Sequence, residues 1–246
     1  MCSVVCRSYK EILMGGGWIR KRKVTNKFYD ALVPFAERWT IKMKVNRIIF
    51  ATGNADKMKE IQMILADLGL EVQSMKEAGV DIDIVENGKT FEENAFIKAT
   101  VIAEKLKKSN LKAIVLADDS GLEIDYLNKE PGIYSARYLG ENTSYTVKNA
   151  NLIERLFGVP DEKRTARFVC AIAAVFPDGR TFSTKAAIEG RIGYEEKGEN
   201  GFGYDPIFYL PEYGKYSAEL APEEKNRISH RGKALEEMKK VLKAQM

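Results

Sequence analysis

From Met43 onward, short apolar runs alternate along the chain with apolar residues at helical spacing. The run from residue 47 to 51 predicts a buried strand, and the polar turn Thr52-Gly53-Asn54 separates it from an amphipathic helix. The buried face of that helix carries Ile61, Ile64, Leu65 and Leu68. The pattern therefore predicts a strand, a loop and a helix in succession.

A capping box predicts where the second helix begins, because Thr90 is followed three residues later by Glu93. Its apolar stripe consists of Phe91, Ala95, Ala99, Ile102 and Leu106. The next predicted strand, residues 113–117, stops at Asp118-Asp119-Ser120-Gly121. We therefore expect acidic groups at the carboxyl end of a core strand, a position that ligand sites in open α/β sheets favour.

The second half of the chain is richer in strand patterns. A third helix is stopped by Gly158 and Pro160. Residues 167–176 and 181–188 predict a long hairpin. A final helix begins near Ser229, and its buried side carries Ala234, Leu235, Met238, Val241 and Leu242.

Residues 1–42 lack a sustained apolar period and hold nine basic against three acidic residues. We expect them to be an N-terminal extension outside the core, and residues 43–246 to form one domain. A start codon assigned too far upstream, with Met43 as the initiator, explains such a segment. A basic arm that touches RNA or a membrane surface is the alternative.

Composition narrows the class of protein. With 45% apolar and 30% charged residues in a chain of 246, a sizeable core can form. The longest apolar run, residues 168–176, is far shorter than the ~20 residues that cross a bilayer. Three cysteines in neither a zinc spacing nor an even disulfide set fit a reducing compartment, so we expect a cytoplasmic protein. Outside the basic extension the net charge is negative, so we expect no stable nucleic-acid partner for the core.

Several groups of polar residues are candidates for chemistry. The turn Thr52-Gly53-Asn54-Ala55-Asp56-Lys57 brings free N–H groups, a helix dipole and a lysine to one place, which favours an anion, although an ordinary capped turn has the same features. Asp118 and Asp119 are hard oxygen ligands at a strand end that suit Mg²⁺, and Glu86 could supply a further acidic group. Alternatively, Asp118 or Asp119 caps a turn and Glu86 is a solvated loop residue. Lys98 shares a helix face with Asn94 and is either a phosphate ligand or a surface lysine.

The remaining candidates lie nearer the end of the chain. Phe202, Gly203, Tyr204 and Asp205 combine flexible backbone, aromatic rings and a carboxylate, which suits a purine ring as well as a core plug. Lys225 precedes the only histidine of the chain, His230, and its neighbour Arg231 at the predicted start of the last helix. A lone histidine is more often structural than functional, so both interpretations stay open here.

The order of the motifs is more specific than any one of them. Thr-Gly-Asn-x-x-Lys is followed by Thr-Phe-x-Glu-Asn-Ala-x-x-Lys-Ala, Ala-Asp-Asp-Ser-Gly-Leu, Pro-Gly-x-x-Ser-Ala-Arg, Phe-Gly-Tyr-Asp-Pro and Lys-Asn-x-x-Ser-His-Arg. Across residues 46–242 this set resembles the inosine triphosphate pyrophosphatase family, whose members act on dITP and XTP. The resemblance implies a homodimeric α/β protein with a long, curved mixed sheet, flanking helices and two lobes around a nucleotide cleft.

The resemblance also implies roles for individual residues. Residues 52–57 match the family's triphosphate-binding turn, Lys98 matches its helix lysine, and Glu86 matches its metal-binding glutamate. Asp119 matches the carboxylate that serves as general base and metal ligand, with Ser120 beside it on the substrate. The base-recognition residues that match are Phe202, Gly203, Tyr204, Asp205, Lys225, His230 and Arg231.

The implied reaction is Mg²⁺-dependent hydrolysis of ITP, dITP or XTP to the monophosphate and pyrophosphate, by in-line attack of water at the α-phosphorus. Donors from His230 or Arg231 that face O6 would disfavour adenine. One alternative is a Maf-type pyrophosphatase acting on pyrimidine nucleotides. Another is a noncatalytic nucleotide- or RNA-binding module.

Overall fold

A mixed seven-stranded sheet forms the centre of the fold in the computed structural model, which describes residues 45–246. The predicted extension, residues 1–42, lies outside the described residues. The strand order is β2-β1-β3-β4-β5-β6-β7, with β1 parallel to β2 and β3 and the remaining pairs antiparallel. The strands are β1 (Arg47–Phe50), β2 (Glu71–Ser74), β3 (Ile114–Ile124), β4 (Thr165–Val175), β5 (Thr181–Ile192), β6 (Phe208–Leu210) and β7 (Lys215–Tyr216).

Helices cover both faces of the sheet. They are α3 (Ala55–Leu65), α4 (Phe91–Lys108), α5 (Tyr145–Arg155), α6 (Pro222–Ile228) and α7 (His230–Gln245). The apolar sides of α3 and α7 bury Ile48, Phe50, Ile114 and Leu116 on one face. On the other face, α4 buries Ile49, Ala51, Val115 and Ala117. Because side chains alternate along a strand, each strand contributes to both layers.

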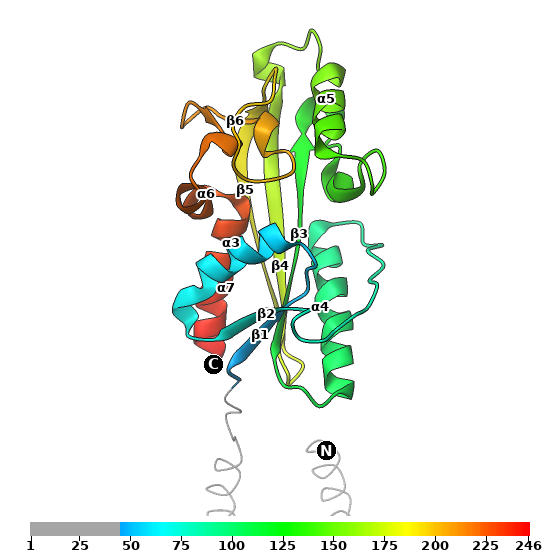
Figure 1. The fold of residues 1–246 in the computed structure, drawn as a ribbon, viewed down its shortest axis with the longest axis vertical. Helices are drawn as coiled ribbons and strands as arrows, with labels where there is room; N and C mark the ends of the chain where they lie inside the picture. Colours follow the sequence, from blue (N-terminus) through cyan, green and yellow to red (C-terminus); the bar gives the residue numbers. More distant parts are fainter. Residues whose placement is uncertain (1–44) are drawn as a thin grey trace, which may run out of the picture. The chain divides into compact units, whose positions relative to one another are not determined.

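A second lobe lies at the far end of the long strands. There α5 and β6 surround an apolar cluster that includes Leu122, Leu152, Phe168 and Phe208 (Figure 1). Strands β3, β4 and β5 run through both lobes, while β1, β2, α3, α4 and α7 gather in the first (Figure 1). The predicted α/β fold with a mixed sheet and flanking helices is confirmed.

The structure corrects one predicted boundary. The third strand does not stop at Asp118, because β3 continues to Ile124 and pairs with β4 from Val115 to Ile124. Its partner β1 ends instead, since the pairing of β1 with β3 reaches only Leu116. The acidic residues therefore lie within a strand, beside the carboxyl end of its shorter neighbour.

Other local predictions are confirmed with small shifts. The hairpin of β4 and β5 is a few residues longer than its apolar pattern, and α7 begins after the Ser229 cap. At α4, the Thr90 hydroxyl accepts from the N–H of Glu93, but the Glu93 carboxylate accepts from Lys89 rather than Thr90. Half of the predicted capping box therefore forms. Within residues 45–246, none of the helices is both long enough and apolar enough to cross a bilayer.

Candidate active site

A cavity of about 340 Å³ opens where β1 ends beside β3. It collects residues from both lobes, from Ala51 to Arg231 along the sequence. Of the residues predicted for the site, it is lined by Thr52, Gly53, Asn54, Lys57, Glu86, Lys98, Ser120, Phe202, Gly203, Tyr204, Asp205, Lys225, His230 and Arg231.

Three predicted residues do not line the wall of this cavity. Ala55 and Asp56 form the exposed first turn of α3, at its edge. Asp119 is buried one contact behind the wall, because its Oδ1 atom lies 3.6 Å from the Nζ atom of Lys98, which does line the cavity. Its neighbour Asp118 faces the cavity instead.

The turn before α3 is organised by its own side chains. Asn54 Oδ1 accepts from the N–H groups of Asp56 and Lys57 at 2.9 and 3.0 Å, and Thr52 Oγ1 accepts from the N–H of Asn54 at 3.2 Å. Within the described part of the chain, the N–H groups of Gly53 and Ala55 donate to no acceptor. These two donors, the positive end of α3 and the Lys57 ammonium favour an anion at this turn.

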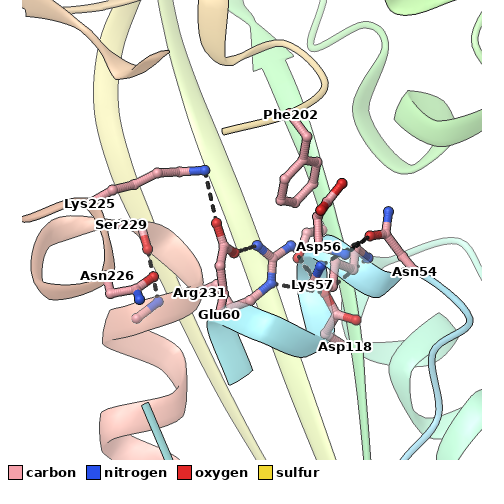
Figure 2. Close-up of polar contacts among 12 residues, drawn as sticks. Asn54, Asp56, Lys57, Glu60, Asp118, Phe202, Lys225, Asn226, Ser229 and Arg231 are labelled. Atoms are coloured by element: carbon pink, nitrogen blue, oxygen red, sulfur yellow. Dashed lines mark hydrogen bonds and ion pairs between the residues drawn. The ribbon is translucent and has the colours of Figure 1, made fainter. Parts of the chain in front are cut away.

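Asp118 is the most strongly paired carboxylate of the cavity. Its Oδ2 atom lies 3.0 Å from Lys57 Nζ and 3.4 Å from Arg231 Nη2 (Figure 2). The same oxygen accepts a hydrogen bond from Ser120 Oγ. Burial opposes the charge of Asp118, but Lys57, Arg231 and Lys98 outweigh that effect and hold its pKa well below the usual value. Asp118 therefore stays ionised and anchors two cations from two different helices.

Asp119 lies on the opposite face of β3. Its Oδ2 atom accepts from Asn94 Nδ2 at 3.0 Å, and Lys98 Nζ lies between its Oδ1 atom and Glu86 Oε2, 3.1 Å from the latter. Burial raises the pKa of Asp119, and the negative charges of Glu86 and Asp118 raise it further. Lys98 and the hydrogen bond from Asn94 lower this pKa but do not outweigh the other effects. Two carboxylates thus converge on a single cation.

Glu86 and Asp119 are the residues that could hold a metal ion. Within residues 45–246, no group of three or more histidine, cysteine, aspartate and glutamate side chains is arranged as a metal site. The donor set is therefore two carboxylates, held around the Lys98 ammonium. Such a set fits a hard cation like Mg²⁺, which is bound through one or two carboxylates and completes its shell with waters and substrate phosphates.

The loop that brings Phe202 to the cavity is held by Asp205. Its carboxylate accepts from the N–H of Phe202 at 2.9 Å, from Ser217 Oγ at 2.7 Å and from Lys225 Nζ at 2.7 Å. The hydroxyl of Tyr204 donates to the carbonyl of Ser135 at 2.7 Å. Asp205 and Tyr204 therefore hold the loop in place. The ring of Phe202 lines the cavity, and Lys225 Nζ lies 4.9 Å from the centroid of that ring.

His230 and Arg231 reach the cavity from α7. The His230 ring stacks on Phe168 with a centroid distance of 4.9 Å, and its Nδ1 atom has no hydrogen-bond partner within the described residues. Burial, together with the charges of Arg231 and Lys225, lowers the pKa of His230 well below its usual value, so the ring is neutral at pH 7. A residue that lines the cavity thus carries a buried ring nitrogen without a hydrogen-bond partner among the described residues.

These residues belong to a chain with clear relatives. A sequence profile of the Ham1 family matches residues 48–241. The chain belongs to the Ham1 family. A dITP/XTP pyrophosphatase of Clostridium perfringens is 50% identical over 200 residues, which is 81% of this chain and 98% of the relative. The dITP/XTP pyrophosphatase of Bacillus subtilis is 45% identical over 196 residues, covering 80% of this chain and 96% of the relative.

Solved Ham1 structures have the same fold. The Ham1 protein of Staphylococcus aureus superposes with a TM-score of 0.71 at 41% identity, covering 81% of this chain and all of that one. A HAM1 protein of Coxiella burnetii superposes with a TM-score of 0.70 at 42% identity, covering 80% of this chain and 98% of that one. The family predicted from the order of the motifs is thereby confirmed.

Among the residues to which sequence reasoning assigned no role, Glu60 contacts two cations that line this Ham1 cavity, and Tyr145 lines the cavity itself. Glu60 on α3 accepts hydrogen bonds from Lys225 Nζ at 2.9 Å and from Arg231 Nη1 (Figure 2). One carboxylate therefore links two cations that line the cavity. Its only sequence signal is its position three residues after Lys57, on the same helix face. Tyr145 on α5 lines the cavity with its ring perpendicular to that of Tyr204, and nothing in its local sequence marks it.

Proposed function

We propose that this protein hydrolyses the triphosphates of non-standard purine nucleosides, namely ITP, dITP and XTP, to the monophosphate and pyrophosphate, and so clears them from the nucleotide pool. The observation that supports this most is that one cavity is lined both by charged groups and by aromatic rings. Lys57, Lys98 and Glu86 line it, and so do Phe202 and His230. Triphosphate and purine are the two halves of one ligand that needs both.

Asp119 is the proposed catalytic residue. It orients water and takes its proton as the water attacks the α-phosphorus, so pyrophosphate leaves without a covalent enzyme intermediate. Lys57 and Lys98 offset the negative charge that grows on the departing pyrophosphate. Ser120, whose hydroxyl reaches Asp118, and the free N–H groups of the turn before α3 hold the phosphates in position.

Glu86 and Asp119 would hold a divalent cation, for which we propose Mg²⁺. When bound, the ion would neutralise phosphate oxygens next to the cleaved bond. Lys98 already occupies a position between these carboxylates, 3.1 Å from Glu86 and 3.6 Å from Asp119. The position of the Lys98 ammonium supports the proposal that the Glu86 and Asp119 carboxylates stabilise a cation.

Selection of the base rests on His230 and Arg231. Donors directed at O6 of inosine or xanthine would be left unpaired by the 6-amino group of adenine, at a cost of about 1 to 3 kcal/mol each. The aromatic face for the purine is Phe202. Lys225 and Asp205 support the loop that presents it.

The same proposal includes the setting in which the enzyme works. We propose a homodimer in the cytoplasm, with residues 43–246 as the catalytic domain and no stable nucleic-acid partner for that domain. Sedimentation of the full chain tests the dimer. Steep salt-dependent RNA binding without turnover would favour a noncatalytic module instead.

A substrate panel tests the proposed activity. Full-length protein and a variant beginning at Met43 are incubated with ITP, dITP, XTP, GTP, ATP and dTTP, with and without Mg²⁺, and pyrophosphate and orthophosphate are measured separately. We expect Mg²⁺-dependent release of pyrophosphate, fastest from ITP, dITP and XTP, by both proteins. Preference for dTTP would indicate a Maf-type enzyme, and orthophosphate as the first product would refute the reaction.

A further inference from the structure

Asn94 is a fully buried amide whose two ends contact two different parts of the cation site. Its Oδ1 atom accepts from the N–H of Gly88 at 2.8 Å, and its Nδ2 atom donates to Asp119 Oδ2 at 3.0 Å. Since a backbone N–H can only donate, the Gly88 contact fixes which end of the amide faces Asp119. Asp119 therefore always receives an N–H donor at Oδ2.

This bond makes the two oxygens of Asp119 unequal. Oδ2 is held by Asn94, whereas Oδ1 faces the Lys98 ammonium. Without the Asn94 donor, the carboxylate would be free to turn about its last torsion, which is a broad and soft one. Asn94 therefore determines which oxygen is directed toward the Lys98 and Glu86 side.

The other end of Asn94 fixes the loop that carries Glu86. Gly88 packs so closely that a Cβ atom added to it would lie 2.7 Å from Asn94 Oδ1 and 2.8 Å from Glu93 Cβ. The carbonyl of Glu86 itself accepts from Arg137 Nη2 at 3.3 Å. The loop is thus tied to α4 on one side, and Asn94 links it directly to the strand of Asp119.

We propose that Asn94 is a positioning residue that sets the spacing and orientation of the Glu86 and Asp119 carboxylates, and through them the affinity of the site for a divalent cation. This inference rests on the proposed function. Hydrogen-bond partners of metal ligands typically change metal affinity or activity by about 10- to 100-fold when they are removed. A buried asparagine that only supports the fold would change stability alone.

The test measures Mn²⁺ binding without turnover. Mn²⁺ is titrated by electron paramagnetic resonance into the full chain saturated with inosine α,β-imidotriphosphate, whose α–β link is not hydrolysed. We expect Asn94→Ala to weaken Mn²⁺ binding by about 10-fold or more. With ITP at saturating metal, kcat should fall by a similar factor, whereas KM for ITP should stay within about threefold.

Asn149 provides a matched control. It is also a buried helical asparagine, and its Nδ2 atom donates to Glu196 Oε1 at 2.6 Å and to the carbonyl of Gly203 at 3.3 Å. Asn149→Ala removes a comparable buried amide away from Glu86 and Asp119. We expect its Mn²⁺ affinity to stay within twofold of that of the wild type.

Gly88→Ala is a second variant in case Asn94→Ala does not fold. It changes a loop residue and removes neither Glu86 nor Asp119. The added Cβ atom would push against Asn94 Oδ1, so Mn²⁺ binding should again weaken. Mn²⁺ affinity within twofold of wild type in a folded Asn94→Ala or Gly88→Ala variant would overturn the positioning role. If the wild type itself releases no pyrophosphate from ITP, the proposed function fails instead, so the two failures are distinguishable.

Discussion

Asp118 and Asp119 are consecutive on β3 and serve opposite faces of the sheet. Asp118 pairs with Lys57 at 3.0 Å on the side of α3 and α7, and Asp119 contacts Lys98 at 3.6 Å on the side of α4. Because β1 ends before this point, the cavity extends around the free edge of β3, and both lysines line it. Two adjacent carboxylates can therefore act on one ligand although their side chains point apart.

Replacing Asp119 by asparagine should remove most turnover. The substitution keeps the shape of the side chain and an acceptor for Asn94 but cannot take a proton from water, so we expect kcat for ITP to fall by about 10² or more. Lys98 keeps Glu86 as a partner, so the fold should survive, as circular dichroism and urea unfolding would check. Wild-type turnover in a folded variant would exclude Asp119 as the catalytic residue.

Replacing Asp118 by asparagine should instead lower stability. Lys57 and the buried Arg231 would lose the carboxylate between them, and breaking a buried ion pair from one side costs about 3 to 5 kcal/mol. Urea unfolding measures the loss. The control is Asp178→Asn, which breaks an exposed pair with Arg180 and should change the free energy of unfolding by less than about 1 kcal/mol. Equal effects of the two variants would contradict the anchoring role of Asp118.

Arg231 should contribute to the preference of the enzyme for ITP over ATP. We expect Arg231→Ala to raise KM for ITP and to reduce the ITP/ATP ratio of kcat/KM by about tenfold, since one unpaired donor is worth about 1 to 3 kcal/mol. The variant also removes one of the two cations that pair with Glu60 and one of the two that pair with Asp118, so stability must be measured alongside. Arg231→Lys keeps a charge but not the planar fork and should also narrow the ratio. An unaltered ITP/ATP ratio in both variants would remove Arg231 from base selection.

His230 should make stability fall in mild acid. In the unfolded chain its pKa is about 6.5, whereas burial keeps the folded ring neutral at lower pH. Below pH ~6.5 the imidazole therefore binds a proton in the unfolded state but not in the folded state. The free energy of unfolding then drops by up to about 1.4 kcal/mol per pH unit until the pKa of the folded state is reached. Above that pH both states are neutral and the effect is absent.

Unfolding at pH 7.5 and 5.5 checks this sign. The drop between the two values should be smaller in His230→Gln than in the wild type, because His230 is the only histidine of the chain. Neighbouring carboxylates titrate in both proteins, so the difference reports His230. An equal drop in both would mean that the folded ring takes up a proton as readily as the unfolded one.

The fold was predictable where local patterns carry it. The capped helix that begins after Thr90, the hairpin of β4 and β5 and the last helix after Ser229 all follow from apolar spacing and caps. The boundary of β3 was not predictable in this way. Strand β4 satisfies its backbone beyond Leu116, so Asp118 and Asp119 extend the strand despite their low strand propensity.

The candidate site was predictable as a set of residues rather than as a network. Motifs locate Lys57, Lys98 and His230, but pairings between distant segments leave no local signal. Glu60 is joined to Lys225 across 165 positions, and only the packing of α3 beside α6 and α7 brings them together. The position of Asp119 behind Lys98 likewise depends on which face of β3 it occupies.

Hydrolysis of ITP in water enriched in ¹⁸O tests the central claim most directly, because the proposed mechanism directs water at the α-phosphorus. Products are separated and analysed by mass spectrometry in the presence of Mg²⁺. The account predicts one ¹⁸O atom in the inosine monophosphate, unlabelled pyrophosphate and no early orthophosphate. Label in pyrophosphate, or orthophosphate as the first product, would contradict it.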